Sequence, residues 1–149
     1  MKKLLVLILA LVMVLSLKLP SDMPVSESNK TAFVNVETGE NAVAQLIEAG
    51  EKLLSETTQK EFIESELSDS KDVVIKSFDN KKQINGKDAL VCEFTYTSPK
   101  GSAITTIIFV ANGSKECVVA LSYGCDKVDG SLAKNQQDII DSITVKVAL

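Results

Sequence analysis

Two serine–lysine pairs are the first residues in this chain that suggest catalytic chemistry. Ser98 precedes Lys100 by two positions, and Ser114 directly precedes Lys115. A buried lysine loses its charge readily and can then accept a proton from a serine nucleophile. Both pairs stand among turn-forming residues, where we expect the lysine to be solvated and charged. The pairs therefore favour a role in turns over a Ser/Lys hydrolase.

Three aspartates near the C-terminus are weak candidates for binding a metal ion. Asp126, Asp129 and Asp138 surround a polar loop and the beginning of an amphipathic stretch, and carboxylates are good ligands for Ca²⁺. Their spacing does not match the calcium-loop pattern D-x-[DN]-x-[DN]-G, and helix capping explains such aspartates as well. A glycosidase needs only two carboxylates, but no acidic pair stands out. We assign no catalytic and no cofactor-binding residue.

The residue types that the chain lacks exclude several classes of site. Every basic residue is a lysine, and the chain has no histidine. Without histidine, Ser-His and Cys-His nucleophiles and the histidine-containing zinc sites are impossible, and three cysteines cannot form a four-cysteine site. Without arginine there is no bidentate clamp for carboxylate or phosphate. The isolated glycines form no phosphate-binding loop. We therefore expect a non-enzymatic protein with no cofactor.

The balance of charges limits the partners of the chain. The formal net charge is −4, and three lysines lie in or beside the apolar N-terminus, which leaves the rest of the chain more acidic still. An acidic domain repels the phosphates of nucleic acids and the headgroups of anionic membranes. We expect no nucleic-acid partner and an unidentified protein partner in the cell envelope. We expect contact with a membrane only through the N-terminal segment, if that segment is uncleaved.

The N-terminus has the pattern of an export signal. Lys2 and Lys3 precede an apolar run over residues 4–17 in which only Ser16 is polar. As a helix the run spans about 21 Å, less than the ~30 Å of a bilayer core, so a signal peptide fits better than a permanent membrane span. The best cleavage site precedes Leu17, and Lys18 stands where a lipoprotein has its acylated cysteine. We predict an extracytoplasmic protein with a signal peptide or N-terminal anchor over residues 1–19; cleavage and mode of attachment stay open.

The N-terminal half after this segment is expected to be a tether followed by a helix. Residues 20–31 are polar and contain two prolines, which is typical of a flexible tether. Residues 32–36 suit a short edge strand. Apolar residues then recur at three- and four-residue intervals, which predicts a long amphipathic helix over residues 40–66.

The C-terminal half is expected to be mostly strands. A short strand should end at Asn80, and a three-stranded antiparallel meander should follow, with turns at 98–101 and at 112–113. A last helix should bury Leu132, Ile139 and Ile140 before a closing strand over residues 143–147. We predict an α+β domain over residues 32–149, an antiparallel sheet with helices packed on its faces.

Two segments resemble the PsbP-like family. They are INGKDA at 84–89 and DIIDSI at 138–143, with the apolar hairpins between them. This family includes the extrinsic protein P of photosystem II and the DcrB-like bacterial envelope lipoproteins. The resemblance implies an α/β/α sandwich built on an antiparallel sheet over roughly residues 33–147. It transfers no catalytic residue to this chain, because the family shares none.

These observations lead to one preferred function and two alternatives. The preferred function is a non-enzymatic accessory or interaction module of the bacterial cell envelope. The first alternative is a small-ligand or calcium-binding envelope protein. The second alternative, ranked below it, is a hydrolase that uses a Ser/Lys pair or paired carboxylates.

The expected strand register predicts that no disulfide forms within the domain. Tight turns on either side of the central strand set Ile107 opposite both Cys92 and Val118. Cys92 and Cys117 are then two strands apart and on opposite faces, beyond the roughly 7 Å between Cα atoms that a disulfide allows. We expect these two cysteines to be buried. Cys125 should be exposed, where it can pair between molecules.

Overall fold

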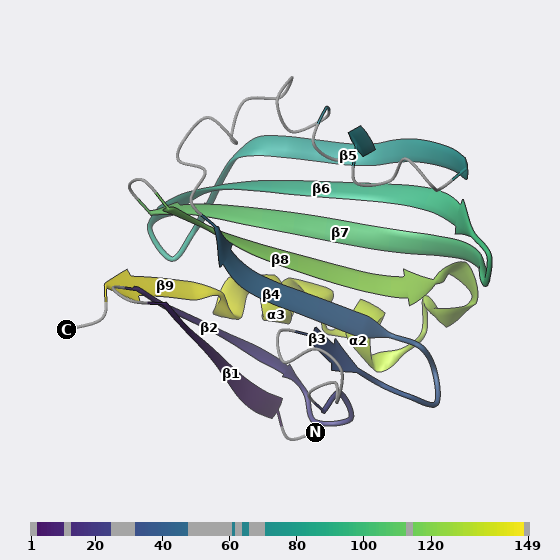
Figure 1. Ribbon diagram of the computed structural model, residues 1–149, viewed down its shortest axis with the longest axis horizontal. Coiled ribbons are helices and arrows are strands. Elements are labelled where there is room, and N and C mark those ends of the chain that lie inside the picture. The colour runs from purple at the N-terminus through teal and green to yellow at the C-terminus, as the bar shows by residue number, and fades with distance from the viewer. Residues whose placement is uncertain are drawn as a thin grey trace.

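A six-stranded antiparallel sheet is the centre of the molecule (Figure 1). The structure, a computed structural model, describes residues 3–10, 13–24, 32–47, 61, 64–65, 71–112 and 115–147. The strand order is β3-β4-β8-β7-β6-β5, in which β5 to β8 form a continuous meander. The six strands are β3 (Ala32–Val34), β4 (Asn41–Ile47), β5 (Lys71–Ile84), β6 (Lys87–Ser98), β7 (Gly101–Asn112) and β8 (Lys115–Gly124).

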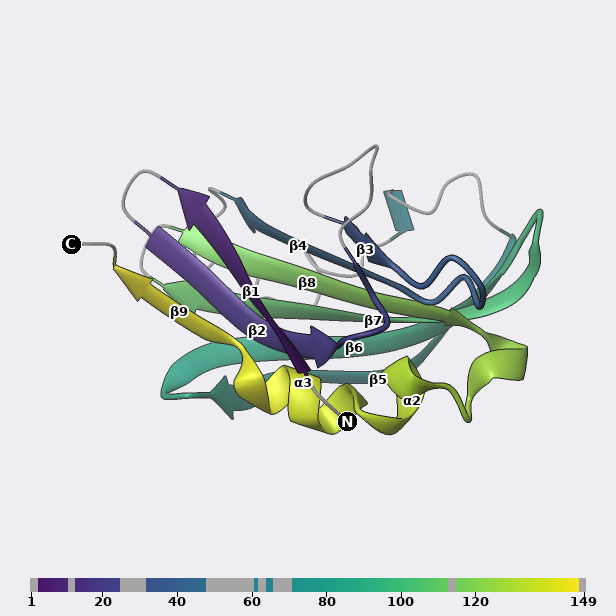
Figure 2. The same cartoon turned by 90° about the horizontal axis from the view of Figure 1, so that it is seen from below.

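A second layer covers one face of this sheet. It combines two short helices with a three-stranded antiparallel sheet of order β1-β2-β9. Figure 2 shows the helices along one side of the six-stranded sheet. These elements are β1 (Lys3–Ala10), β2 (Met13–Pro20), the 3-10 turn η2 (Cys125–Lys127), α2 (Ser131–Lys134), α3 (Gln136–Ser142) and β9 (Thr144–Val147). The described residues therefore form an α+β fold, as predicted.

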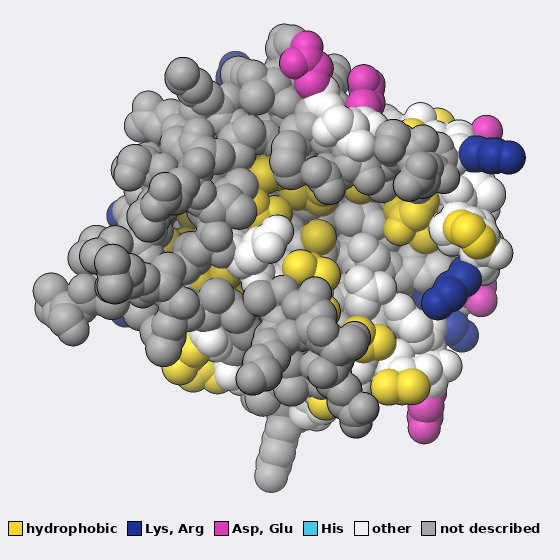
Figure 3. Space-filling view, in the orientation of Figure 1, with side chains coloured by type: hydrophobic (Ala, Val, Ile, Leu, Met, Phe, Trp, Pro, Cys, Tyr) yellow, Lys and Arg dark blue, Asp and Glu magenta, His cyan; other side chains and the backbone are white. Residues whose placement is uncertain are grey.

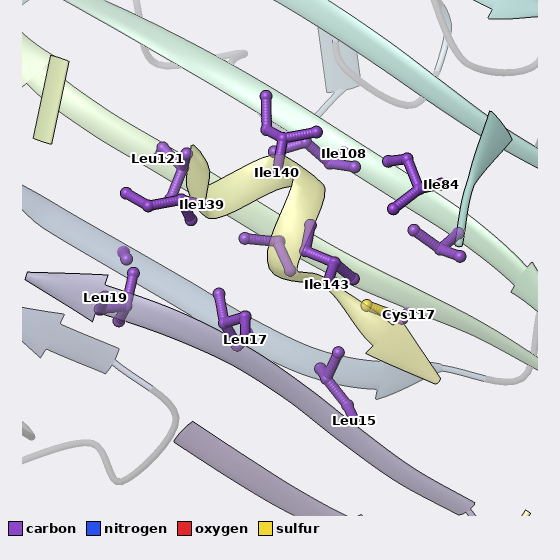
Figure 4. Packing of buried hydrophobic residues seen from close by; sticks show 14 of the residues in the cluster. Leu15, Leu17, Leu19, Ile84, Ile108, Cys117, Leu121, Ile139, Ile140 and Ile143 are labelled. Carbon is purple, nitrogen blue, oxygen red and sulfur yellow. The ribbon is translucent and has the colours of Figure 1, made fainter. Parts of the chain in front are cut away.

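The main hydrophobic core lies between the two layers. Figure 4 shows leucines of β2 and isoleucines of α3 packed against side chains of β7 and β8. Leu132, Ile139 and Ile140 are all buried there, as predicted. Each fully buried side chain of this size contributes about 1.5–3 kcal/mol. A smaller cluster, centred on Phe94 and Phe109, lies on the opposite face of the large sheet.

The turn between β5 and β6 joins the meander to the helical layer. Asn85 and Gly86 have φ values of 49° and 80°, as a two-residue type I′ hairpin requires. The side-chain amide of Asn85 donates to the carbonyl oxygens of Asp141 (3.1 Å) and Ile143 (2.7 Å). This turn therefore fixes where α3 ends and β9 begins.

The prediction of a long helix over residues 40–66 is wrong at the beginning of that range. Residues 41–47 form β4, which pairs with β8 along its whole length. Alanine and leucine favour helix, but this propensity is weak, and burial of Ala42 and Ala44 against the second layer outweighs it. Most of residues 48–70 lie outside the described residues; Glu61, Glu64 and Ser65 are helical.

The apolar N-terminal segment also differs from expectation, because residues 3–10 and 13–20 form the antiparallel strands β1 and β2 instead of a helix. Leu15, Leu17 and Leu19 are fully buried, while Lys18 between two of them is exposed. This alternation is the period of a strand with one buried face. The folded unit therefore includes residues before 32, and Met23, expected in the tether, is buried. Export by this segment stays a prediction.

In the described part of the chain, no helix is long and apolar enough to cross a membrane.

The register of the meander is partly as predicted. Cys92 pairs with Ile107 as expected, but Ile107 pairs with Ala120 instead of Val118. The difference arises because Asn112 still pairs with Lys115, which moves the turn one residue along the chain. A shift of two positions leaves every side chain on its predicted face. Cys92 and Cys117 are thus buried on opposite faces and Cys125 is exposed, as predicted.

Candidate functional site

A polar pocket of about 370 Å³ lies at the end of the six-stranded sheet where β6 turns into β7. Three segments line it: the β3–β4 turn, the β6–β7 hairpin, and the end of β8 with η2. Figure 3 shows lysine and acidic side chains gathered at the right-hand end of the view, where Figure 1 places this hairpin. The pocket is therefore assembled from turns that only the sheet brings together.

The β3–β4 turn is held by one asparagine. The side-chain oxygen of Asn35 accepts hydrogen bonds from the backbone N–H groups of Glu37 (3.1 Å) and Thr38 (3.3 Å). Gly39 follows with φ = 79°, a left-handed conformation that favours glycine. These bonds give the pocket rim at Thr38 and Gly39 a defined shape.

A buried carboxylate joins this turn to the helical layer. Glu40 is only 1% exposed, and its Oε2 accepts a hydrogen bond of 2.9 Å from the backbone N–H of Leu132 at the start of α2. A Cβ at Gly130 would lie 2.6 Å from the same oxygen, so glycine permits this approach. Because α2 has no cap from its own flanking residues, Glu40 serves as its N-terminal cap from a distant segment.

A second carboxylate makes the same connection at the surface. Asp22 accepts a hydrogen bond from the hydroxyl of Ser131 (3.0 Å to Oδ2) and another from the side-chain amide of Asn35 (3.1 Å). The rim of the pocket is thus tied to α2 and to the chain after β2.

The β6–β7 hairpin uses its serine for its own geometry. The hydroxyl of Ser98 donates to the carbonyl oxygen of Gly101 (2.9 Å) and accepts from the backbone N–H of Lys100 (3.2 Å). Lys100 is exposed. This serine therefore stabilises a turn, as expected from the sequence, and is not paired with a buried base.

Three hydroxyl groups form a row beside the pocket. Thr105 Oγ1 lies 2.8 Å from Ser122 Oγ and 3.4 Å from the Tyr96 hydroxyl. Tyr96 and Ser122 line the pocket, while Thr105 is buried between them. Because hydroxyl groups both donate and accept, this row can adapt to a polar molecule in the pocket.

A second tyrosine of the lining stays protonated at neutral pH. Burial raises the pKa of Tyr123 above the usual tyrosine value, and the nearby Glu93 and Cys125 raise it further. The phenol is therefore a neutral hydrogen-bonding group over the physiological range.

The remaining charged groups of the lining are Lys100, Lys127 and Asp126. With hydroxyls, backbone groups and charges of both signs, the pocket can hold a small polar molecule by hydrogen bonds. None of these groups is a histidine, because the chain has none.

The structure does not bring the three candidate metal ligands together. Asp126 lies in η2 at the pocket, Asp129 is exposed in the following turn, and Asp138 is exposed in the first turn of α3. Among the residues that the structure describes, no group of three Cys, Asp or Glu side chains is placed to hold a metal ion. Of the other serine–lysine pair, Ser114 lies outside the described residues and Lys115 begins β8.

Sequence reasoning missed the buried carboxylate and the row of hydroxyls. Glu40 was placed at the start of a helix, although Asn35 and Gly39 just before it are a turn signal. Thr105 and Ser122 lie next to the apolar runs of β7 and β8, which is a weak local sign that they have a special environment. Their proximity depends on strand pairing and is invisible in the linear sequence.

No protein-family model and no curated protein matches this sequence. Solved structures do resemble the fold. Cyanobacterial PsbP from Synechocystis sp. PCC 6803 has a TM-score of 0.64 at 12% identity, covering 89% of this chain and 86% of its own. LpqN, described as involved in cell envelope biogenesis of Mycobacterium tuberculosis, has a TM-score of 0.64 at 15% identity, covering 99% of this chain and 91% of its own.

A third similar structure is PA94 from Pseudomonas aeruginosa, a protein of unknown function, with a TM-score of 0.58 at 10% identity. It covers 94% of this chain and 96% of its own. Likeness at such low identity concerns the fold. The order of strands in the meander and the α+β class agree with the expectation from the sequence, and the described helices α2 and α3 lie on one face of the sheet. This chain therefore has the PsbP-like fold.

Proposed function

We propose that this chain is a non-enzymatic accessory module of the bacterial cell envelope that acts outside the cytoplasm. One observation carries the proposal: Ser98, the lining serine that belongs to a serine–lysine pair, uses its hydroxyl within its own turn. Ser98 both donates and accepts within the β6–β7 hairpin. A nucleophile needs a base within hydrogen-bond reach, and this hydroxyl has turn atoms there instead.

The fold supports the same function by analogy. PsbP and LpqN share the fold, and LpqN is described as involved in cell envelope biogenesis. A fold can host several functions, so the analogy supports only the location in the cell envelope. The argument against catalysis comes from the pocket.

The absence of catalysis is tested with esterase, peptidase, phosphatase and glycosidase substrates. We expect only background turnover from the full chain. Turnover that disappears in Ser98→Ala or Asp126→Asn, and persists in the surface control Ser77→Ala, would contradict the proposal.

The location is tested by fractionation of the native cells and by the intact mass of the protein. We expect the protein in the envelope or the medium. A purely cytoplasmic protein would contradict the proposed setting, whatever the enzyme assays show.

The pocket itself favours a second candidate function, the binding of a small polar ligand. Amino acids, short peptides and monosaccharides are suitable probes, with the shift of the thermal unfolding midpoint as the readout. A real ligand should lose its shift in Ser122→Ala, which alters the lining, and keep it in Ser77→Ala. Calcium chloride should give no shift, because the three aspartates are apart.

A further inference from the structure

The outward face of the small sheet combines exposed leucines with lysines. Leu5 and Leu7 of β1 are 56% and 57% exposed. Leu5 pairs with the exposed Lys18 of β2, and Leu7 pairs with Ser16. Thr144 and the exposed Lys146 of β9 continue the same face. We call these six residues the outer face.

The hairpin that carries the outer face is an integral part of the fold. Leu15 and Leu17 of β2 are fully buried in the main core. Residues 13–16 pair with β9, and the backbone N–H of Lys18 donates to Ser142 Oγ at 2.9 Å. The fold likeness to LpqN covers 99% of this chain, which includes both strands. Cleavage before Leu17 would remove β1, half of β2 and a core leucine.

The charge of the outer face is opposite to that of the whole protein. Its charged members, Lys18 and Lys146, are both cations, and none of its six residues is acidic. The chain as a whole carries −4. Net charge therefore predicts repulsion from an anionic membrane, whereas this face presents two exposed leucines on β1 beside the lysines of β2 and β9. Leucines beside lysines are a composition with which peripheral segments bind the lipid interface.

A second copy of the chain suits this face less well. In a two-fold contact the same patch meets itself, so the two lysines of one copy would find no acidic partner among the six residues of the other. Like charges brought together at an interface oppose association. An anionic lipid surface instead offers phosphate groups to the lysines and acyl chains to the leucines.

We infer that residues 3–20 stay with the mature domain and that the outer face docks it on an anionic lipid bilayer. The side chains of Leu5 and Leu7 enter the interface, and Lys18 and Lys146 contact lipid phosphates. Figure 1 agrees with this geometry, since β1 lies at the lower edge of the molecule in that view. The inference does not rest on the proposed function, because it needs only an anionic surface.

Cosedimentation of the full chain with lipid vesicles tests this inference. We expect binding to vesicles of phosphatidylglycerol and phosphatidylcholine, little binding to phosphatidylcholine alone, and weaker binding as salt rises. Each lysine near an anionic surface is worth about fivefold in partition, so Lys18→Gln with Lys146→Gln should weaken binding about 25-fold. Ser16→Lys adds a cation at the centre of the face and should strengthen binding about fivefold.

Matched variants elsewhere on the surface separate this face from general effects. Lys76→Gln with Lys81→Gln removes two exposed lysines of β5, and Val36→Ser removes an 86% exposed apolar side chain. Both should bind like the unaltered protein. Leu5→Ser with Leu7→Ser should bind about tenfold more weakly. Circular dichroism confirms that each variant is folded.

Four results would overturn the docking on lipid. The protein could bind both kinds of vesicle equally, or bind neither. The β5 control variant could lose as much vesicle binding as the variant without Lys18 and Lys146. The leucine variant could lose self-association while it still binds vesicles. A native protein whose N-terminus begins at residue 17 or later would overturn the retained hairpin. That last result would still agree with the proposed envelope location, so the two proposals fail separately.

Discussion

Thr105 and Thr106 are neighbours on β7 with opposite surroundings, and valine at each position should have opposite effects. Both are buried, at 6% and 1% exposure. Thr105 Oγ1 lies 2.8 Å from Ser122 Oγ. Thr106 Oγ1 has no hydrogen-bond partner in the part of the chain that the structure describes. Valine replaces the hydroxyl by a methyl group of similar size and keeps the branched shape that suits a strand.

The magnitudes follow from the cost of burying a polar group. A buried hydroxyl without a partner costs about 1–3 kcal/mol, which valine at position 106 removes. We expect Thr106→Val to raise the free energy of unfolding by about 1 kcal/mol. Thr105→Val removes a hydrogen bond and leaves the Ser122 hydroxyl without this partner, so it should lower that free energy by about 1 kcal/mol. The two variants should therefore differ by about 2 kcal/mol.

Urea unfolding followed by far-ultraviolet circular dichroism measures this difference, because the chain has no tryptophan. The slope of the free energy of unfolding against urea concentration should be the same in the unaltered protein and in both variants. The unfolding midpoints then report differences in stability. The thermal midpoints should move about 2–4 °C in opposite directions. If Thr106→Val is as destabilising as Thr105→Val or more so, the hydroxyl of Thr106 has a partner and the reasoning is refuted.

Three further predictions concern the buried carboxylate, a tyrosine and the cysteines. Glu40→Ala leaves the start of α2 uncapped and should lower the free energy of unfolding, measured in urea, by about 2 kcal/mol. Glu40→Gln can still accept the hydrogen bond and should lower it less. Equal losses in the two variants would contradict the capping role. In Tyr96→Phe, the ultraviolet absorbance of the single remaining phenol, Tyr123, should titrate at higher pH in the folded than in the denatured protein. The pKa of Tyr123 is raised in the folded protein. The contribution of this phenol to stability is therefore complete below its unfolded pKa of about 10, and it is lost as pH rises through the folded pKa. Titration of the folded protein at the pKa of the denatured protein would contradict this. Ellman's reagent should modify Cys125 first in the native protein and reach the two buried cysteines only after denaturation; simultaneous reaction of all three would contradict their burial.

Elements with local signals could be predicted from the amino-acid sequence. Alternating apolar residues and tight turns predicted the strands on either side of β7 and the pairing of Cys92 with Ile107. The spacing of Leu132, Ile139 and Ile140 predicted the buried side of the last helical segment. These features depend on turn geometry and side-chain period over a few residues, which the chain specifies without help from distant parts.

Elements with ambiguous local signals depend on contacts between distant parts of the chain. Residues 41–47 have helix-forming composition but pair with β8, and residues 3–20 have the composition of an export signal but form a hairpin. In both, an apolar run fits a helix and a buried strand equally well, and the available partner strands settle the choice.

The pocket and the outer face depend on tertiary structure for the same reason. Glu40 meets Leu132 across 92 positions of the sequence, and Thr105 meets Ser122 only through the pairing of β7 with β8. Lys18 and Lys146 share a face because β2 stands between β1 and β9. Composition shows that the protein is acidic and lacks histidine. Where its charges and hydroxyl groups gather is decided by strand order, because residues distant in the chain become neighbours only when the sheet forms.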